Sequence, residues 1–317
     1  MSEFEYTQGL HKLAEGVYTY FQPPGALGGS NAGLVVDGGV SLLVDTFYDL
    51  NRTGDLLREI KKIPGAWPVN YLINTHVDGD HTFGNQLVEG AEIIASKACA
   101  EEFTRDISPE YYVDFLKRAP TMGKAGKFFL QGLGQYDFEG IRLTPPTRTF
   151  EGRLDLKIGG KEVNLIEVGP AHTEGDIMVY LPGDKLLFSG DVVMTSVTPV
   201  SWHGPSANLI KAMSTILGLE VNVLVPGHGP IVDKSFAQKL KEYWEYTAEE
   251  ARKQYDKGIS ALEAGIALAS TGKFSNFPLP ATNIANVHML YREFSGEETP
   301  LDKFAILGKV AELLIPD

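Results

Sequence analysis

Four short polar loops of this chain, each directly after an apolar run, offer four of its seven histidines and three aspartates as candidate ligands. The loops are THVDGDH (75–81), GPAHTEGD (169–176), FSGD (188–191) and VPGHG (226–229), and they supply His76, Asp78, Asp80, His81, His172, Asp191 and His228. Imidazole nitrogens and carboxylate oxygens are ligands that zinc, iron and manganese ions take in proteins. Seven such side chains are too many for one tetrahedral ion, so the set predicts two divalent ions with one bridging aspartate.

Each loop by itself is a weak signal. The Gly-His-Gly triplet at 227–229 is more often an ordinary turn, and HVDGDH (76–81) alone also suits a solvated acidic loop or a calcium site. The order and combination of the four loops make the metal prediction specific. The chain carries neither the G-x-S-x-G elbow of serine hydrolases nor the G-x-x-x-x-G-K loop that binds nucleotide phosphates, so neither competes with it.

Such loops need strands that end close together, because a rigid sheet can aim loop side chains at one point. Residues 33–46 are two apolar runs joined by Asp37-Gly38-Gly39, a hairpin pattern. Further strands are predicted at 69–75, 91–96, 161–169, 176–182 and 185–191, with a last strand and loop at 221–229. Helices are predicted at 50–63 and from Ser206. This alternation favours an α/β (α+β) fold with mixed sheets covered by helices.

Two segments differ from this pattern. Residues 100–147 carry many aromatic side chains among glycines, and we interpret them as an excursion of helix and loop beside the main sheet. The excursion is either a lid over the polar loops or a local aromatic core. Residues 233–317 are predicted to be helical, with a capping box at Ser260 and Glu263. Their amphipathic helix either packs on its own domain or forms the surface of a homodimer.

The bulk composition limits the function classes. The chain has 317 residues, 41 of them acidic and 28 basic, which gives a net charge of −13. Such a surface repels phosphate backbones and anionic membranes, so we expect a small-molecule substrate and neither nucleic-acid nor membrane binding. The single cysteine, Cys99, excludes a disulfide within the chain. The first ten residues lack a basic start and an apolar run, so we expect no signal peptide and a cytoplasmic protein.

The ordered set of loops resembles the metallo-β-lactamase superfamily, whose signature is His-x-His-x-Asp-His followed by a later His, an Asp and a final His. The flanking residues are similar too: PAHTEGDIMVYLP around His172, LLFSGD before Asp191 and VPGHGP around His228. The likeness covers about residues 15–232. It implies a four-layer αββα sandwich of two mixed sheets in a metallo-β-lactamase-like domain at 1–232, with the 100–147 excursion as part of it. Residues 233–317 would be a C-terminal helical extension.

The resemblance also implies a role for each loop residue. His76 and His172 would hold the first ion, with Asp78 in the position of the family's second histidine. Asp80, His81 and His228 would hold the second ion, and Asp191 would bridge the two. Asp80 would also orient the attacking hydroxide as the catalytic residue. Asp45, at the end of a predicted strand, would act behind the ligands at most.

Asp78 is the departure from the family pattern. Three carboxylates beside two dications leave the centre less positive than the family's arrangement, which should make the bound water less acidic. Zinc is the metal that the resemblance favours, whereas a third carboxylate favours the harder Mn²⁺ or Fe²⁺. The alternatives are that Asp78 is no ligand and a single ion binds Asp80, His81 and His228, that Asp78 binds through a water, or that the site is degenerate.

The resemblance implies a metal-dependent hydrolase that uses a metal-bound hydroxide on an ester, thioester, lactone or amide. A first alternative is a non-hydrolytic metal enzyme, either a di-iron oxidase or a lyase or cyclase of small-molecule biosynthesis. The flavodiiron branch of the superfamily also has a carboxylate, a glutamate, at the position of Asp78. However, the residues after His228 do not have the pattern of that branch's flavin domain. A second alternative is a non-catalytic member of the fold that binds a ligand.

Overall fold

The predicted hairpin lies at the centre of the first sheet. β3 (Asn31–Asp37) pairs antiparallel with β4 (Val40–Val44). Gly38 and Gly39 at its tip have φ angles of +57° and +79°, a conformation that this tight turn requires and that glycine adopts without steric cost. The computed structural model describes residues 4–23, 27–105, 108–299 and 301–314.

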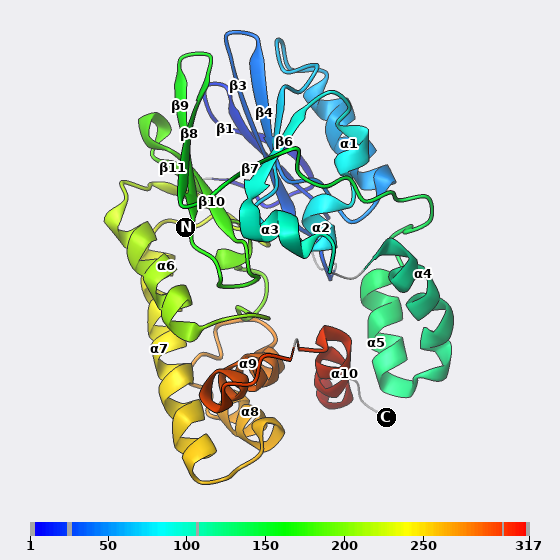
Figure 1. Ribbon diagram of the computed structural model, residues 1–317, viewed down its shortest axis with the longest axis vertical. Helices are drawn as coiled ribbons and strands as arrows, with labels where there is room; N and C mark the ends of the chain where they lie inside the picture. The colour runs from blue at the N-terminus through cyan, green and yellow to red at the C-terminus, as the bar shows by residue number, and fades with distance from the viewer. Residues whose placement is uncertain (1–3, 24–26, 106–107, 300, 315–317) are drawn as a thin grey trace.

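Within these residues the strands form a seven-stranded sheet and a five-stranded sheet, both mixed (Figure 1). The first sheet has the order β1 (Gly9–Ala14), β2 (Val17–Phe21), β3, β4, β5 (Tyr71–Ile73), β6 (Glu92–Ser96) and β7 (Arg148–Phe150). The second has the order β12 (Val223–Val225), β11 (Leu186–Phe188), β10 (Ile177–Leu181), β9 (Lys161–Glu167) and β8 (Arg153–Ile158). β4 to β7 are parallel to one another, as are β11 and β12, and the other neighbours are antiparallel.

The two sheets face each other across a buried apolar core. Val35 and Leu42 of the first sheet and Val163, Val179 and Phe188 of the second belong to this core, and each is at most 3% exposed. Burying a side chain of this kind contributes about 1.5–3 kcal/mol. The strands that end in the predicted polar loops are therefore held rigidly by the packing between the sheets.

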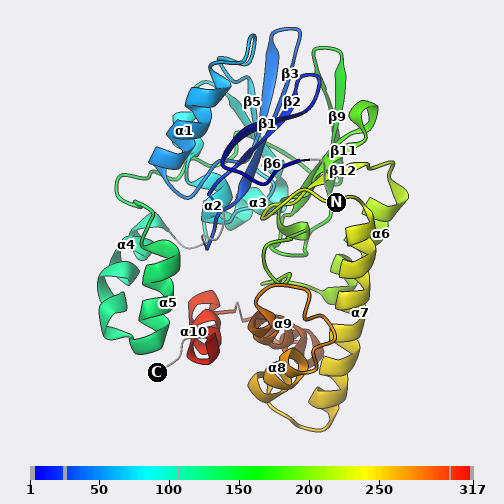
Figure 2. The ribbon, with the colours of Figure 1, turned by 180° about the vertical axis from the view of Figure 1, so that it is seen from behind.

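Helices cover the outer face of each sheet. α1 (Leu50–Ile60) packs Leu56, Leu57 and Ile60 on the first sheet, and the Asp49 side chain caps it by accepting a hydrogen bond from the Arg52 amide at 2.7 Å. α6 (Ser206–Gly218) shares a buried cluster with strand residues of the second sheet, and α7 (Ser235–Asp256) packs against α6 and extends beyond the sheet (Figure 2). The arrangement confirms the predicted αββα sandwich of two mixed sheets.

The described residues form further α-helices. They are α2 (Gly79–Thr82), α3 (Lys97–Glu102), α4 (Pro109–Arg118), α5 (Gly123–Leu133), α8 (Ala261–Ser270), α9 (Asn283–Ser295) and α10 (Lys303–Leu314). Short 3-10 turns occupy Asn85–Leu87, Ala119–Thr121, Pro182–Asp184, Gly190–Val192 and Pro280–Thr282. No helix in the described part of the chain has the length and hydropathy needed to span a bilayer.

The aromatic excursion forms a local core that the last helix completes. α10 lies between α5 and α9 in both views (Figures 1 and 2). Phe304 of α10 packs its ring 4.4 Å from that of Phe115 on α4 and 5.3 Å from that of Phe129 on α5. Tyr112, Phe115 and Phe129 of the excursion are thus buried against a helix that comes almost 200 residues later in the sequence.

The C-terminal helices share a core with the second sheet. Tyr243 and Trp244 of α7 and Leu268 of α8 lie in one buried cluster with Leu187 of β11 and Met213 of α6. α8 begins with the predicted capping box, in which the Ser260 side chain accepts from the Glu263 amide and the Glu263 carboxylate accepts from the Ser260 amide. The domain boundary at residue 232 stays a sequence-based prediction, but the two segments pack as neighbours.

Candidate metal centre

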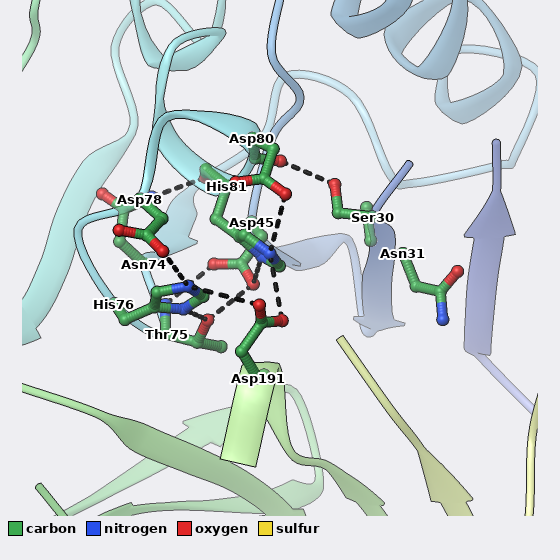
Figure 3. Close-up of polar contacts among 12 residues, drawn as sticks. Ser30, Asn31, Asp45, Asn74, Thr75, His76, Asp78, Asp80, His81 and Asp191 are labelled. Carbon is green, nitrogen blue, oxygen red and sulfur yellow. Dashed lines mark hydrogen bonds and ion pairs between the residues drawn. The ribbon is translucent and has the colours of Figure 1, made fainter. Parts of the chain in front are cut away.

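The four predicted loops converge beside one edge of the sandwich. The loop after β5 hydrogen-bonds the start of β10, with the Ile177 amide donating to the Thr75 carbonyl at 2.8 Å. The loops after β11 and β12 join through the Gly227 amide and the Gly190 carbonyl, also at 2.8 Å. All seven predicted side chains lie together here, listed by loop as His76, Asp78, Asp80 and His81, then His172, Asp191 and His228. Figure 3 shows those of the first loop facing Asp191.

One group of donor atoms contains His76, His172 and Asp191, which are all buried. Oδ2 of Asp191 lies 3.9 Å from Nε2 of His76 and 3.6 Å from Nε2 of His172. Asp78 borders this group, because its Oδ2 lies 3.1 Å from Nε2 of His172 and 3.8 Å from Nε2 of His76. The structure therefore places Asp78 where a further ligand of the first ion would lie.

A second group contains Asp80, His81 and His228. Nε2 of His228 lies 3.4 Å from Nε2 of His81 and 3.2 Å from Oδ2 of Asp80. Asp191 borders this group as well, with Oδ1 3.2 Å from His81 Nε2 and Oδ2 3.1 Å from His228 Nε2. Asp191 thus lies between the two groups, as a bridging ligand must.

These donors fit a pair of divalent ions. Metal–ligand bonds of about 2.0–2.2 Å place neighbouring donor atoms roughly 3–4 Å apart. In addition, the buried Nε2 of His76 makes no hydrogen bond with any described residue, and a buried polar atom without a partner is costly unless a ligand satisfies it. A cation between His76, His172 and Asp191 would supply that missing interaction.

Hydrogen bonds behind the histidines turn the correct nitrogen toward each group. Nδ1 of His172 donates to the Val200 carbonyl at 2.7 Å, and Nδ1 of His81 donates to Oδ2 of Asp45 at 2.9 Å. The Thr75 hydroxyl donates to the same carboxylate oxygen at 2.8 Å, so Nδ1 of His76 must donate to Thr75 at 2.9 Å. With Nδ1 protonated, Nε2 keeps its lone pair for a metal.

Asp45 lies behind the candidate ligands, in the position that the sequence reasoning allowed, and contacts one of them directly. Its backbone has a φ of +62°, which is uncommon for a residue with a side chain, and its carboxylate also accepts a hydrogen bond from the Thr75 amide at 2.8 Å. Sequence reasoning placed Asp45 behind the ligands at most and did not consider Thr75. The position of Thr75 directly before His76 was the one local signal available.

Two glycines make room for the ligands. A Cβ on Gly227 would collide with Oδ1 of Asp191, and a Cβ on Gly190, where φ is +50°, would lie 2.7 Å from the Thr75 hydroxyl. The glycines of VPGHG and FSGD are thus explained by close approach of the loops to Asp191 and Thr75.

The carboxylates raise the pKa of three imidazoles in the absence of metal. Burial opposes the charge on His81, but Asp191, Asp80 and Asp45 outweigh burial and raise its pKa well above the ordinary value. Burial by itself would lower the pKa of His228, but Asp191 and Asp80 outweigh burial and raise it to about 10. Burial likewise opposes the charge on His172, and its hydrogen bond to Asp78 together with Asp191 raises its pKa to about 9. At neutral pH all three imidazoles of the metal-free site are therefore expected to be protonated.

Metal binding is expected to release at least two protons per chain at pH 7, because each ligating Nε2 of His81, His172 and His228 must lose its proton. The apparent affinity should rise with pH up to about 9–10, where His172 and His228 become neutral without metal. Calorimetric titration of the metal-free protein in two buffers with different ionisation enthalpies measures this release. Binding enthalpies that do not depend on the buffer would contradict it.

A cavity of about 160 Å³ opens over the two groups. Its floor contains Asp78, Asp80, His172, Asp191 and His228, and its walls are largely apolar. The wall residues include Tyr48, Tyr112, Phe129, Trp202, Phe304 and Leu307, together with the lysine Lys303. A larger hollow of about 460 Å³ lies beside α1, but none of the seven predicted residues lines it.

The walls come from segments that are distant in the sequence. Tyr112 and Phe129 belong to the 100–147 excursion, which therefore both forms a local core and borders the cavity. Trp202 also lines the cavity, whereas His203 points its side chain to the surface with 43% exposed. The contributions of α10, including Lys303 and Phe304, were not predicted from the sequence, which gave no local signal for them.

The αββα fold and the two groups of side chains that could hold metal ions are consistent with the metallo-β-lactamase superfamily. The family model of the metallo-beta-lactamase superfamily matches residues 25–228, and the chain belongs to this superfamily. Among curated proteins, the alpha subunit of 2,4-dinitroanisole O-demethylase of Nocardioides sp. (strain JS1661) is 27% identical over 246 residues, which are 74% of this chain and 61% of that protein. The linear primary-alkylsulfatase of Pseudomonas sp. (strain ATCC 19151) is 23% identical over 71% of this chain and 46% of its own length. The chain thus spans less than two thirds of both relatives.

Solved structures show the same fold. A metallo-beta-lactamase from Pontibacter korlensis has a TM-score of 0.56 at 20% identity and covers 75% of this chain and 98% of its own. An inverting sec-alkylsulfatase from Pseudomonas sp. has a TM-score of 0.66 at 14% identity, covering 93% of this chain and 52% of its own. Because the second match covers 93%, the structural likeness extends into the C-terminal helices.

Proposed function

We propose that the protein is a metal-dependent hydrolase that cleaves an ester, thioester, lactone or amide with an apolar alkyl or aryl group. The observation that carries the proposal is the apolar cavity directly over two groups of metal-binding side chains. A cavity of about 160 Å³ suits a small molecule, and its aromatic walls favour an apolar substrate. The substrates named for the two curated relatives, 2,4-dinitroanisole and linear primary alkyl sulfates, also carry an apolar group on oxygen.

The residues of the centre would have separate roles in hydrolysis. Two divalent ions held by the seven side chains would supply a Lewis acid and a water activated for attack. Asp80 lines the cavity floor, and its Oδ2 lies 3.2 Å from His228 Nε2, which supports a role as a ligand and as the group that accepts a proton from that water. The aromatic walls exclude bulk water and orient the apolar group of the substrate.

A second candidate is the hydrolysis of an alkyl or aryl sulfate ester. The likeness to a sec-alkylsulfatase extends over 93% of this chain, further than the likeness to the lactamase from Pontibacter korlensis. Sulfate release from octyl sulfate, measured beside ester hydrolysis, separates this candidate from the first.

The test is a chelated protein reconstituted with Zn²⁺, Mn²⁺ or Fe²⁺ and given p-nitrophenyl esters with acyl chains of increasing length. We expect activity to return with at least one metal and kcat/KM to rise by up to about fourfold per added CH₂ until the cavity is filled. Leu307→Ala, in the cavity wall, should weaken this dependence on chain length. Leu313→Ala is the matched control, because that leucine lies on the same helix with 50% exposed.

Each contrary result points to a specific alternative. If the protein hydrolysed no ester, thioester, lactone or amide with any of the three metals, the proposed hydrolase activity would be overturned. Iron in the purified protein together with oxygen uptake would favour a di-iron oxidase. Conversion of a substrate into a product that has not gained water would favour a lyase or cyclase. Metal bound at less than one ion per chain after loading would favour a non-catalytic ligand-binding protein.

A further inference from the structure

A lysine of the last described helix reaches the metal centre. Lys303 is the first residue of α10, and its Nζ lies 2.7 Å from Oδ1 of Asp78, 225 positions earlier in the sequence. Both side chains line the cavity over the two donor groups. They are 23% and 15% exposed, so solvent and salt screen this ion pair less than a surface pair.

The two carboxylate oxygens of Asp78 have different neighbours. Oδ1 faces the ammonium of Lys303, whereas Oδ2 faces Nε2 of His172 at 3.1 Å and Nε2 of His76 at 3.8 Å. Oδ2 is therefore directed at the first donor group while Oδ1 is occupied by a cation of the protein itself. This geometry suits a carboxylate that ligates through one oxygen.

Packing on two sides fixes the helix that carries Lys303. Next to it in the sequence, Phe304 packs against Phe115 and Phe129 of the aromatic core. From the opposite side of α10, Ile306 and Val310 are buried with Ile284 of α9. The ammonium is thus delivered to Asp78 by a packed helix rather than by a side chain on an unsupported loop.

The ion pair revises the charge that the sequence predicted for the centre. Two dications beside Asp78, Asp80 and Asp191 have a formal charge of +1, and the ammonium of Lys303 raises it to +2. The family's arrangement, with a neutral histidine in the position of Asp78, has the same formal charge of +2. The expectation of a less positive centre therefore omitted a cation that only the fold brings to the site.

We propose that Asp78 and Lys303 act as one electrically neutral unit in place of the family's second histidine, in which Asp78 offers Oδ2 to the first ion. Lys303 is a positioning residue, because it acts through Asp78 and not on the substrate. The C-terminal helix is then a part of the metal centre. The inference rests on the metal centre of the proposed function but requires no turnover, so it can be tested by metal binding alone.

The test compares Lys303→Met with Asp78→Asn in titrations of the metal-free full-length chain with Co²⁺ against a chromophoric chelator. Lys303→Met removes a positive charge near the first ion, so the dissociation constant of Co²⁺ at that position should fall by about tenfold. Asp78→Asn removes a ligand and leaves the ammonium, so the same constant should rise by about tenfold or more. The visible Co²⁺ spectrum should also change in both variants, because the oxygens that Asp78 offers to the ion change.

Three further variants complete the design. Lys303→Arg keeps the charge and should retain the wild-type constant and spectrum within about threefold. Asp78→His combined with Lys303→Met recreates the neutral histidine and should bind Co²⁺ with about the wild-type affinity. Lys309→Met is the matched control, because this lysine lies on the same helix and contacts His288 instead, with 3.4 Å between Nζ and Nε2.

The opposite signs of the two effects distinguish this proposal from general damage to the fold. Weaker Co²⁺ binding in both variants, or no change in Lys303→Met, would overturn it. Should Lys303→Met fail to fold, Lys303→Gln removes the same charge and carries the same expectation. Failure of the proposed function would look different, since the binding results would hold while every ester stayed intact.

Discussion

Asp191→Asn is expected to reduce the bound metal from two ions per chain to one at most and to lower kcat/KM by about 10³-fold. Asp191 lies between the two donor groups and contributes an oxygen to each. Burial opposes its ionisation, but the imidazoles of His228 and His81 outweigh burial and hold its pKa well below the usual range. The amide of asparagine keeps the size of the side chain and removes the charge that serves both ions. Elemental analysis after loading and dialysis measures the first effect.

Asp155→Asn is the control for this change. Asp155 is 56% exposed and pairs with Arg153 on the surface of the second sheet, so its loss of charge should leave metal content and activity unaltered. If Asp191→Asn retained two ions per chain, the carboxylate would not bridge, and the two donor groups would have to bind their ions independently.

Asp45→Asn is expected to raise the dissociation constant of the second ion by about 10–100-fold, although Asp45 lies behind the ligands. Its carboxylate accepts one hydrogen bond from Nδ1 of His81 and two hydrogen bonds from Thr75. The asparagine amide reduces the capacity to accept, so His81 loses the partner that fixes its tautomer. The free energy of unfolding should also fall, by about 1–3 kcal/mol, because Asp45 is 2% exposed and its partners would lose their bonds. Chelator competition and urea denaturation measure the two effects.

Two comparisons isolate the cause in this case. Asparagine is among the residues that tolerate a positive φ, so the backbone of position 45 is not itself disturbed. Thr75→Val removes the hydroxyl that accepts a hydrogen bond from Nδ1 of His76. It should weaken the binding of the first ion rather than that of the second. If Asp45→Asn and Thr75→Val each weakened the binding of both ions equally, His76 and His81 would not be oriented by separate hydrogen bonds.

The sequence alone was sufficient for the strands that precede the polar loops and for the set of candidate ligands. Two apolar runs and the Asp37-Gly38-Gly39 turn between them predicted the hairpin of β3 and β4, because apolar runs and turn chemistry are local properties of the chain. The seven candidate ligands could be found because each follows a strand within a short motif that resembles the superfamily. The αββα fold followed from that resemblance, and the family match over residues 25–228 agrees with it.

Tertiary structure alone decided what surrounds those ligands. Lys303 meets Asp78 across 225 positions, and no pattern near either residue indicates the contact. Phe304 and Trp202 likewise become cavity walls only when α10 packs between α5 and α9. The physical reason is that an ion pair or an aromatic contact between distant segments depends on how helices pack. Local periodicity does not encode that packing, so the sequence identified the candidate ligands while the fold set the charge and shape of their surroundings.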